Sequence, residues 1–368
     1  MRYLLFAFSL LLLACSSKEK PETASEILEP LPPKYDITEQ ASAYADSVLS
    51  TLTLEERAGQ CLMPSLYSSS DPSTMALLKR YIEDYHVGGI VLMQGDTKSA
   101  KRLADICEAS KVPLFVAIDA EWGLGMRLED GSIYPRNAML SKEADESGMF
   151  DYGREIADES RSLGINMILG PVVDLSVSRK GVIGNRSFGS DPLLVSNYGV
   201  AYAKGLESGG VISVAKHFPG HGSTVVDSHK GVASIKRNIS ALDSLDLRPF
   251  RDYVNSGLTG IMAGHIKSLA LDPDGNPASV SIDMLTSLLR DEMGFKGLIL
   301  TDAFDMGGAR GFSAADALTA GADLILCPSN IEREYDDLLK NLHDGKLDIR
   351  TLNERCRRIL FVKYLFLN

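Results

Sequence analysis

The chain contains 368 residues, of which 45% are hydrophobic and 24% are charged, and its formal net charge at pH 7 is −11. This is the composition of a globular protein with enough apolar side chains for a large core. The acidic balance argues against nucleic acid as a partner, because nucleic-acid phosphates require a basic surface.

The first segment has the pattern of an export signal. Arg2 precedes the apolar run 3–14, which is too short to cross a hydrocarbon layer of roughly 30 Å and predicts a signal peptide over residues 1–14. Leu12-Leu13-Ala14-Cys15 resembles the bacterial lipobox, in which the cysteine becomes lipidated. We therefore expect a lipid anchor to the membrane at Cys15 and a location in the bacterial cell envelope, at the outer membrane, facing the periplasm or the cell surface. An ordinary secretory signal with an incidental cysteine is the alternative.

Residues 15–34 predict a lipidated cysteine followed by a solvated tether. This segment is rich in Ser, Lys, Glu and Pro, so it cannot bury enough apolar surface to offset the entropy of ordering it. The folded domain is expected over residues 35–368, a length that suits one barrel of about 250 residues or more. Four widely spaced cysteines in apolar stretches predict buried free thiols, although an exported chain could oxidise them. They are Cys61, Cys107, Cys327 and Cys356.

Apolar runs alternate with amphipathic segments of helical length along the folded part. The expected strands are residues 60–66, 88–94, 113–119, 166–175, 211–218, 260–266, 297–302 and 323–327. Their uninterrupted hydrophobic character is typical of parallel strands covered on both faces. The expected helices are residues 99–110, 143–163, 192–208, 242–256, 282–293 and 348–366. Asp191-Pro192 and Gly209-Gly210 are start and stop signals for one of them.

This alternation favours a closed barrel or a doubly wound sheet. No GxGxxG follows the first strand and no P-loop occurs, which weakens the nucleotide-binding alternative. We therefore predict fold class α/β, with a single (β/α)8 barrel of the TIM type and no second domain after the final helix.

Polar side chains stand where several of the expected strands end. They are Asp119, Asp174, Lys216, His217, His265 and Asp302. In a barrel of this type the loops that follow the strands carry function. Polar residues at strand ends can also serve only to face the solvent. The presence of polar residues at several strand ends favours a functional site over this explanation.

The segment 216–229, KHFPGHGSTVVDSH, is the richest in polar groups. His217 and His221 are four residues apart, but the Pro-Gly pair between them breaks a helix and excludes a zinc site of the HExxH type. A metal site built from loops stays an alternative, and we expect neither metal nor organic cofactor. In Asp227-Ser-His229 the carboxylate can hydrogen-bond one imidazole nitrogen while the other nitrogen faces a substrate.

These residues resemble a known family. KHFPGHG followed by Asp227-Ser-His229 is similar to the signature of the β-N-acetylglucosaminidases of glycoside hydrolase family 3, and the similarity extends from Leu54 to Phe361. Further matching blocks are Asp119-Ala-Glu-Trp-Gly-Leu-Gly-Met-Arg127, Met167-Ile-Leu-Gly-Pro-Val-Val-Asp174, Asn185-Arg-Ser-Phe-Gly-Ser-Asp-Pro192, Met262-Ala-Gly-His265, Pro277-Ala-Ser279 and Leu300-Thr-Asp302. The resemblance implies a retaining exo-β-N-acetylglucosaminidase (β-N-acetylhexosaminidase). Such an enzyme releases terminal N-acetylhexosamine from glycans such as peptidoglycan fragments through a covalent glycosyl-enzyme.

The resemblance also implies a role for each matched residue. Asp302 would be the nucleophile, His229 the acid/base and Asp227 the residue that orients His229. The hydroxyls and the N-acetyl group of the sugar would be held by Asp119, Arg127, Arg186, Lys216 and His217. The sequence departs from the family pattern at Trp122, where a glycine is usual, and at Asp305, which provides a second carboxylate as an alternative nucleophile.

Other functions stay open. Phosphate could replace water in the second step, because a neutral imidazole repels an anionic acceptor less than a carboxylate does. The chain would then be a β-N-acetylglucosaminide phosphorylase. A β-glucosidase or β-xylosidase is a further alternative, although such relatives commonly take their acid/base from a second domain. A noncatalytic glycan-binding lipoprotein is the alternative from another class.

Several single residues also have a structural interpretation. Arg186 could pair with Asp191 to brace a loop, and His217 and His265 could be hydrogen-bonded histidines of the core. Trp122 could stack on a sugar or pack a loop. Asp174 is expected to support the mouth of the barrel rather than to touch substrate.

Overall fold

A parallel sheet of seven strands forms the centre of the computed structural model, which describes residues 39–177, 181–222, 224 and 233–367. The strands are β2 (Ser65–Ser68), β3 (Gly89–Gly95), β4 (Phe115–Ile118), β5 (Met167–Ile168), β6 (Ile212–Phe218), β8 (Gly260–Ala263) and β10 (Leu298–Thr301). Neighbouring strands follow the order β10-β8-β6-β5-β4-β3-β2. Most sheet residues are buried, which explains the continuous apolar runs of the sequence. Cys15, Asp227 and His229 lie outside the described residues.

A further pair of strands connects the two edges of this sheet. β1 (Leu62–Met63) runs directly into β2 and pairs in parallel with β11 (Ile325–Leu326). On one side, Thr301 at the end of β10 donates its backbone N–H to the carbonyl of Leu324 at 2.9 Å. On the other side, Gly88 before β3 donates its N–H to the carbonyl of Leu62 at 3.0 Å. The protein therefore has an α/β fold in which a parallel sheet curls toward its own far edge. A short pair, β7 (Ala233–Ser234) and β9 (Ile266–Lys267), lies in the loops.

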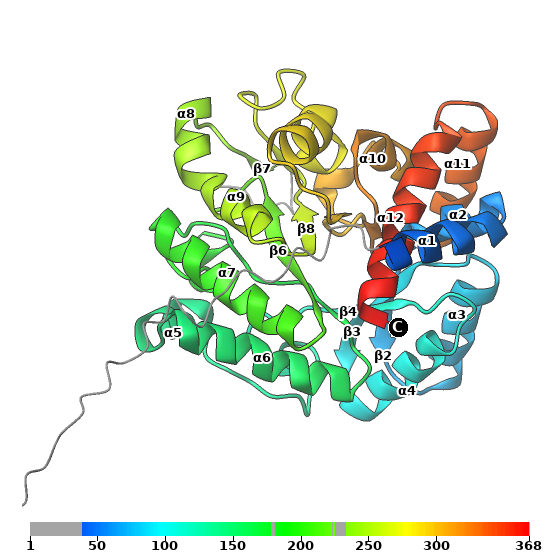
Figure 1. The fold of residues 1–368 in the computed structure, drawn as a ribbon, viewed down its shortest axis with the longest axis horizontal. Coiled ribbons are helices and arrows are strands. Elements are labelled where there is room, and N and C mark those ends of the chain that lie inside the picture. The colour runs from blue at the N-terminus through cyan, green and yellow to red at the C-terminus, as the bar shows by residue number, and fades with distance from the viewer. Residues whose placement is uncertain (1–38, 178–180, 223, 225–232, 368) are drawn as a thin grey trace, which may run out of the picture.

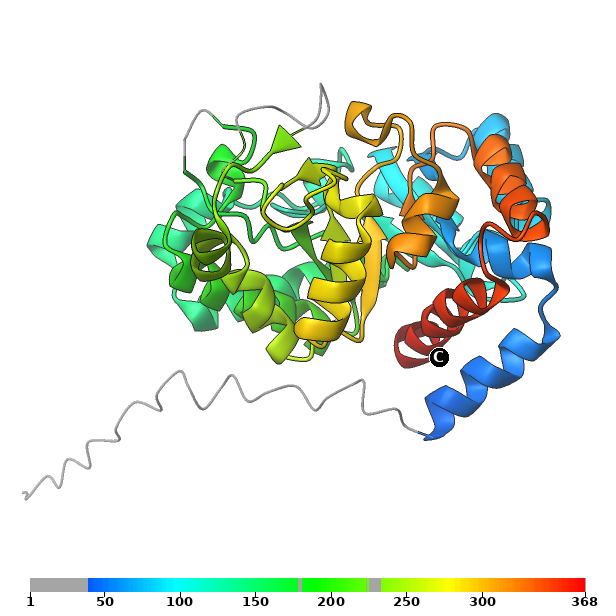
Figure 2. The same ribbon diagram turned by 90° about the horizontal axis from the view of Figure 1, so that it is seen from above.

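The helices surround the curled sheet on its outside, as Figures 1 and 2 show. They are α1 (Glu39–Thr51), α2 (Leu54–Gln60), α3 (Pro72–Glu83), α4 (Thr97–Glu108), α5 (Asn137–Glu143), α6 (Glu146–Ser162), α7 (Pro192–Ser208), α8 (Ile239–Ala241), α9 (Arg248–Asn255), α10 (Ala314–Ala320), α11 (Ile331–His343) and α12 (Ile349–Leu367). Two segments, Leu242–Asp246 and Asp283–Glu292, are π-helical. No described helix is both long and apolar enough to traverse a bilayer.

The helix signals of the sequence have their expected effect at α7. The side chain of Asp191 accepts a hydrogen bond from the N–H of Leu193 at 3.0 Å, and Pro192 occupies the first turn. The helix ends before Gly209, as predicted. The single helix expected over 143–163 is wrong at its start, because α5 ends at Glu143 and Asp145 caps a new helix, α6.

The helix expected over 242–256 is also divided. Leu242–Asp246 forms a π-helical turn, and α9 begins afresh at Arg248, followed by Pro249. Proline has no N–H to donate to the preceding turn, so it suits the first turn of a new helix and not the interior of a longer one.

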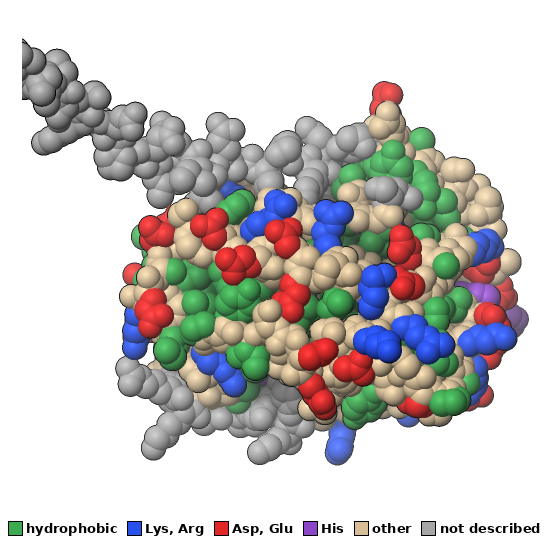
Figure 3. Space-filling view, turned by 90° about the horizontal axis from the view of Figure 1, so that it is seen from below, with side chains coloured by type: hydrophobic (Ala, Val, Ile, Leu, Met, Phe, Trp, Pro, Cys, Tyr) green, Lys and Arg blue, Asp and Glu red, His purple; other side chains and the backbone are tan. Residues whose placement is uncertain are grey.

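The four cysteines of the folded part are buried and free. This confirms the expected buried thiols at Cys61, Cys107, Cys327 and Cys356. On the face drawn in Figure 3, acidic and basic side chains are interspersed with small apolar areas, the pattern of a solvated surface.

Lys363 of α12 places its amino group in the interior of the fold. Its side chain is almost fully covered, its Nζ donates to Oε1 of Gln60 at 2.7 Å, and it lies 5.3 Å from the centroid of the Phe115 ring. Burial disfavours the charged form and lowers the pKa of Lys363 to about 7. Between this value and the ordinary lysine pKa of about 10.4, the unfolded chain binds more protons than the folded chain. The free energy of unfolding therefore rises with pH through this interval.

Replacing Lys363 with Met should remove this contribution. Between pH 6.5 and 8.5, the pKa of Lys363 gives wild type an increase of about 2 kcal/mol in the free energy of unfolding, and the variant should lack it. Urea unfolding at the two pH values measures the difference. The exposed Lys340→Met variant is the control and should behave as wild type. An equal pH dependence in Lys363→Met and wild type would show that Lys363 stays charged in the fold.

Candidate active site

One cavity of about 430 Å³ opens where the parallel strands end at their carboxyl termini. Six of the eight residues that the sequence predicted for catalysis and sugar binding line it: Asp119, Arg127, Arg186, Lys216, His217 and Asp302. They come from the ends of β4, β6 and β10 and from the loops after β4 and β5. The remaining two predicted residues, Asp227 and His229, lie outside the described part of the chain. The cavity has the size of a small-molecule site, for which about 300–1,000 Å³ is usual.

Lys216 contacts two carboxylates of the cavity lining. Its Nζ lies 2.8 Å from Oδ1 of Asp119 and 2.9 Å from Oε1 of Glu121. Asp119 also accepts a hydrogen bond from Nη2 of Arg127. Burial opposes ionisation of both acids, but the adjacent cations outweigh it. They hold the pKa of Asp119 well below its usual range and lower that of Glu121 to about 2.

Arg186 is held by Glu121 through two parallel hydrogen bonds. Its Nε donates to Oε2 at 2.8 Å and its Nη2 donates to Oε1 at 2.7 Å. The alternative in which Arg186 pairs with Asp191 is wrong, because Asp191 is occupied as the cap of α7. This bidentate geometry fixes the plane of the guanidinium and keeps it charged at the cavity wall.

His217 is oriented by a buried carboxylate. Its Nδ1 lies 2.7 Å from Oδ2 of Asp174, which also accepts the backbone N–H of His217 at 3.2 Å. The other oxygen of Asp174 accepts the N–H of His221 at 2.5 Å. Asp174 is fully buried and does not line the cavity, whereas His217 does. Asp174 therefore supports the site, as expected. Within the described residues no cluster of acidic, histidine or cysteine side chains has the arrangement of a metal site.

Asp302 stands directly after β10 and its carboxylate faces the cavity. Its N–H continues the strand ladder by donating to Ala263 O at 2.8 Å, and its Oδ1 accepts the N–H of Ala303 at 2.8 Å. Burial raises the pKa of Asp302, but the electrostatic influence of the adjacent His217 and His265 and the hydrogen bond from the N–H of Ala303 outweigh burial, so the net pKa is lowered. Such a carboxylate is ionised and available as a nucleophile at neutral pH.

Much of the remaining cavity lining is apolar and rich in sulfur. Met93, Met126, Met262 and Met306 line it together with Cys327. Thioether side chains adapt their shape to a ligand and pack against the apolar faces of rings. The cavity therefore offers both polar groups and adaptable apolar side chains to a ligand.

Glu121 is the residue of the site whose role the sequence reasoning did not identify. It lines the cavity and joins Lys216 to Arg186. A signal was available, because Asp119 and Glu121 are two positions apart and side chains two positions apart in extended backbone share a face. The first acid of the pair was assigned a role and the second was treated only as part of a motif.

Two residues with open interpretations belong to the framework. The guanidinium of Arg136 lies 3.4 Å from the centroid of the Trp122 ring, and Trp122 does not line the cavity, so it packs a loop. His265 is fully buried, and its ring nitrogens lie 2.7 Å from Oγ of Ser279 and 3.0 Å from the carbonyl of Ala303. His265 is thus a hydrogen-bonded buried histidine that fixes the residue after Asp302.

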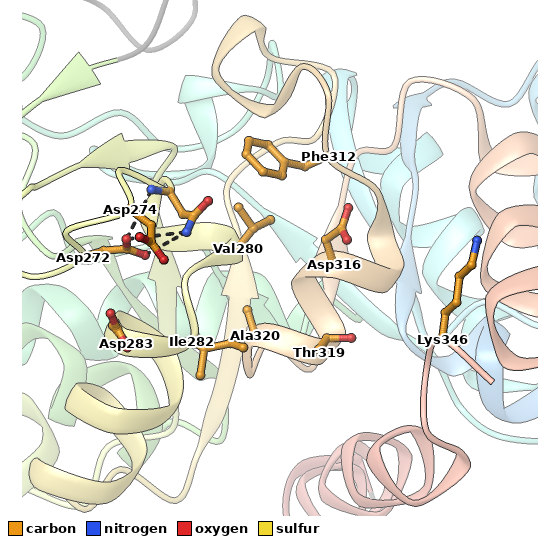
Figure 4. Close-up of a pocket in the computed structure, with 11 residues that line it drawn as sticks. Asp272, Asp274, Val280, Ile282, Asp283, Phe312, Asp316, Thr319, Ala320 and Lys346 are labelled. Carbon is orange, nitrogen blue, oxygen red and sulfur yellow. Dashed lines mark hydrogen bonds between the residues drawn. The ribbon is translucent and has the colours of Figure 1, made fainter.

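A second cavity of about 480 Å³ lies elsewhere and has a different character (Figure 4). Four aspartates and one lysine line it: Asp272, Asp274, Asp283, Asp316 and Lys346. Asp272 is already engaged by the hydroxyl of Ser281 at 2.6 Å and by the amide of Asn276. None of the residues that the sequence predicted for the site lies here, so the cavity around Asp302 is the candidate active site.

Comparison with known proteins places this chain among the glycoside hydrolases. Residues 53–362 match the profile of the glycosyl hydrolase family 3 N terminal domain. A beta-hexosaminidase of Nitrosomonas eutropha is 34% identical over 276 residues, which cover 70% of this chain and 77% of that protein. Beta-hexosaminidase A of Pseudoalteromonas piscicida is 30% identical over 376 residues, covering 88% and 63%. The structure of a family 3 β-N-acetylglucosaminidase from Paenibacillus sp. superimposes with a TM-score of 0.80 at 30% identity, covering 86% and 63%. This chain thus spans less than two thirds of the last two proteins.

Proposed function

Because the chain belongs to glycosyl hydrolase family 3, we propose that it is a retaining exo-β-N-acetylglucosaminidase that releases terminal N-acetylhexosamine from glycans such as peptidoglycan fragments. The observation that carries the proposal is the meeting of Asp302 with Asp119, Arg127, Arg186, Lys216 and His217 around one cavity. A retaining glycosidase needs an ionised carboxylate that can attack the anomeric carbon of the sugar. It also needs hydrogen-bonding groups in the same cavity that hold the sugar in place.

In the first step, an oxygen of Asp302 forms a bond to the anomeric carbon and the glycosidic bond breaks. His229, held by Asp227, gives its proton to the departing oxygen. In the second step, His229 removes a proton from water, whose oxygen displaces Asp302 and frees the sugar with its original anomeric configuration. Lys216 and Arg127 keep Asp119 ionised, so this carboxylate accepts hydrogen bonds from sugar hydroxyls while Arg186 and His217 donate them.

The proposal for His229 and Asp227 is supported by the described residues that precede them in the chain. Thr224 is buried, and its Oγ1 lies 2.6 Å from Nδ1 of His221, which is itself tied to Asp174 beneath the cavity. Thr224, three positions before Asp227 in the sequence, therefore lies next to residues that support the active-site wall. A proton donor at His229 would make the site complete within one domain.

We also propose that the curled sheet is a single (β/α)8 barrel formed by residues 35–368. The pairing of β1 with β11 and the hydrogen bonds that join this pair to both edges support closure of the sheet. The location of the candidate site at the carboxyl ends of the strands is the one expected in such barrels.

The activity is tested with aryl β-glycosides. We expect hydrolysis of aryl N-acetyl-β-glucosaminide with release of free sugar, and at least about a hundredfold lower kcat/KM on aryl glucoside and xyloside, because a site built for the N-acetyl group leaves polar groups unpaired without it. Sugar 1-phosphate as the main product in phosphate buffer would instead identify a phosphorylase. Preference for glucoside or xyloside would overturn the sugar assignment, and binding without turnover would identify a glycan-binding protein.

We propose in addition that Cys15 carries a lipid and holds the enzyme in the bacterial cell envelope. The support is the lipobox-like sequence before Cys15 and the polar composition of residues 15–34. Fractionation of cells that express wild type or Cys15→Ser tests this, since the variant should leave the membrane fraction. Equal membrane retention of both proteins would contradict it.

A further inference from the structure

Asp305 is a carboxylate of the cavity lining that the two catalytic steps do not use. It follows Asp302 by three residues, lines the same cavity and is exposed. The N–H of Met306 donates to the carbonyl of Ala303 at 3.1 Å and closes a turn around Asp305, whose neighbours Phe304 and Met306 are buried. The turn therefore holds Asp305 at the opening of the cavity. The sequence departs from the family pattern at this position, so the carboxylate is a property of this chain.

The charges of the cavity lining balance except at Asp305. Besides His217, the charged residues of the lining are three permanent cations and four acids: Arg127, Arg186, Lys216, Asp119, Glu121, Asp302 and Asp305. The three cations form ion pairs with Asp119 and Glu121, which leaves one excess positive charge that Asp302 offsets. Within the described residues Asp305 takes part in no ion pair. Asp305 therefore gives the lining its excess of negative charge.

The electrostatic field of Asp305 reaches the interior of the cavity. Cys327 is buried and lines the cavity. Burial raises the pKa of the Cys327 thiol, and among the charged groups Asp305 raises it most. Taken as a sphere, the cavity of about 430 Å³ is about 9 Å across, which is close to the Debye length of about 8 Å at physiological ionic strength. Salt therefore screens Asp305 only in part from a charge that enters the cavity.

An anionic acceptor would meet this charge in the second catalytic step. In hydrolysis, the oxygen of water bonds to the anomeric carbon, the bond to Asp302 breaks, and His229 takes a proton from the water. In phosphorolysis, an oxygen of hydrogen phosphate would form the same bond, and the product would be the β-sugar 1-phosphate. An imidazole donor repels phosphate less than a carboxylate donor does, but Asp305 returns a carboxylate to the cavity. Only phosphate carries a negative charge toward it.

We propose that Asp305 makes the second step select water over phosphate and other anionic acceptors. The carboxylate acts through its charge, which lowers the local concentration of anions in the cavity, and needs no contact with the sugar. The inference rests on the proposed function, because it assumes that a glycosyl intermediate forms on Asp302. It assigns the choice of acceptor to a residue outside the set that binds the sugar and breaks the glycosidic bond.

The test measures how the glycosyl-enzyme divides between two acceptors. Aryl N-acetyl-β-glucosaminide is turned over in phosphate buffer, and free N-acetylglucosamine and its 1-phosphate are quantified together. Asp305→Asn should raise the ratio of 1-phosphate to free sugar about tenfold over wild type at low salt, because it removes a like charge from the path of phosphate. Both products come from one intermediate, so the ratio does not depend on how fast the intermediate forms. Added sodium chloride should raise the ratio in wild type and have less effect in the variant.

Two controls separate the charge of Asp305 from its shape. Methanol is an uncharged acceptor, so the ratio of methyl glycoside to free sugar should be equal in wild type and Asp305→Asn. Asp336→Asn removes an exposed acid of α11 that does not line the cavity, and its ratio with phosphate should equal that of wild type.

Three results would overturn the inference. The first is an unchanged phosphate ratio in Asp305→Asn, including no 1-phosphate from either protein. The second is an equal rise of the methanol and phosphate ratios, which would indicate a change of shape. The third is sugar 1-phosphate as the main product of wild type.

Binding separates failure of this inference from failure of the proposed function. N-acetyl-β-glucosamine 1-phosphate and methyl N-acetyl-β-glucosaminide are titrated into Asp302→Asn with and without Asp305→Asn, so that neither ligand is cleaved. The 1-phosphate should bind about tenfold more tightly when Asp305 is replaced, and the methyl glycoside equally to both proteins. If wild type does not cleave the aryl substrate, the proposed function fails and the titrations alone decide the inference, which an absence of binding would also reject. If it cleaves that substrate but the 1-phosphate binds both proteins equally, only the inference fails.

Discussion

Asp302→Asn is expected to lower kcat on aryl N-acetyl-β-glucosaminide by roughly 10³–10⁵-fold with little change in KM, because it removes the nucleophile and leaves the binding groups in place. The amide has nearly the same shape as the carboxylate and can still receive the N–H of Ala303 through its carbonyl oxygen. The fold should therefore persist, which unfolding in urea can verify. Steady-state kinetics on the same preparation measures the loss.

Asp305→Asn is the matched control, because Asp305 lines the same cavity three residues later and is more exposed. It should change kcat by less than about tenfold, as an acid that does not bond to the sugar carbon would. Azide gives a second test with Asp302→Ala. It should restore turnover by attacking the anomeric carbon from the vacated face, which yields the α-glycosyl azide. Full activity in Asp302→Asn together with inactivity of Asp305→Asn would show that Asp305 is the nucleophile and Asp302 is not.

Lys216→Met is expected to affect both stability and catalysis. The change keeps most of the side-chain volume but leaves Asp119 and Glu121 without the cation between them. Breaking a buried ion pair by removal of one partner costs about 3–5 kcal/mol. We also expect kcat/KM to fall by about 10²-fold or more, because Asp119 loses the contact that fixes it against the sugar.

The acid sensitivity of this variant gives a sharper readout than its stability at neutral pH. In wild type the pKa values of Asp119 and Glu121 lie below their unfolded values, with Glu121 at about 2. The stability they contribute is therefore present above the unfolded pKa of about 4 and is lost only as pH falls toward the folded value. Without Lys216 both values rise, so acid unfolding should begin at higher pH. Lys340→Met is the control, and equal acid midpoints for Lys216→Met and wild type would contradict the role of Lys216.

Much of this arrangement could be predicted from the sequence, because buried parallel strands leave a strong local signal. Each of the expected strand segments overlaps an observed strand, and the polar residues at their ends, such as Asp119, Lys216 and Asp302, meet at one edge of the sheet. Parallel strands bring their carboxyl ends together whatever the length of chain between them. That regularity allows a site to be predicted without any knowledge of loop shape.

Interactions between distant loops could not be predicted in the same way. The partner of Arg186 is Glu121, 65 positions away, whereas the local candidate Asp191 is used to cap α7. Sequence proximity favours the nearer acid, and only the fold determines which carboxylate a side chain reaches. The same applies to His265, whose burial against Ser279 and Ala303 depends on how three loops stack.

The sulfur-rich lining of the cavity has a consequence when the protein meets oxidants. Peroxide and hypochlorous acid convert a thioether into a polar sulfoxide without cutting the chain. Met93 and Met126 are partly exposed in the cavity, so they would be oxidised before the methionines of the core. Oxidation would then lower the enzymatic activity while the fold stays intact. Methionine sulfoxide reductases could restore the activity without synthesis of new protein.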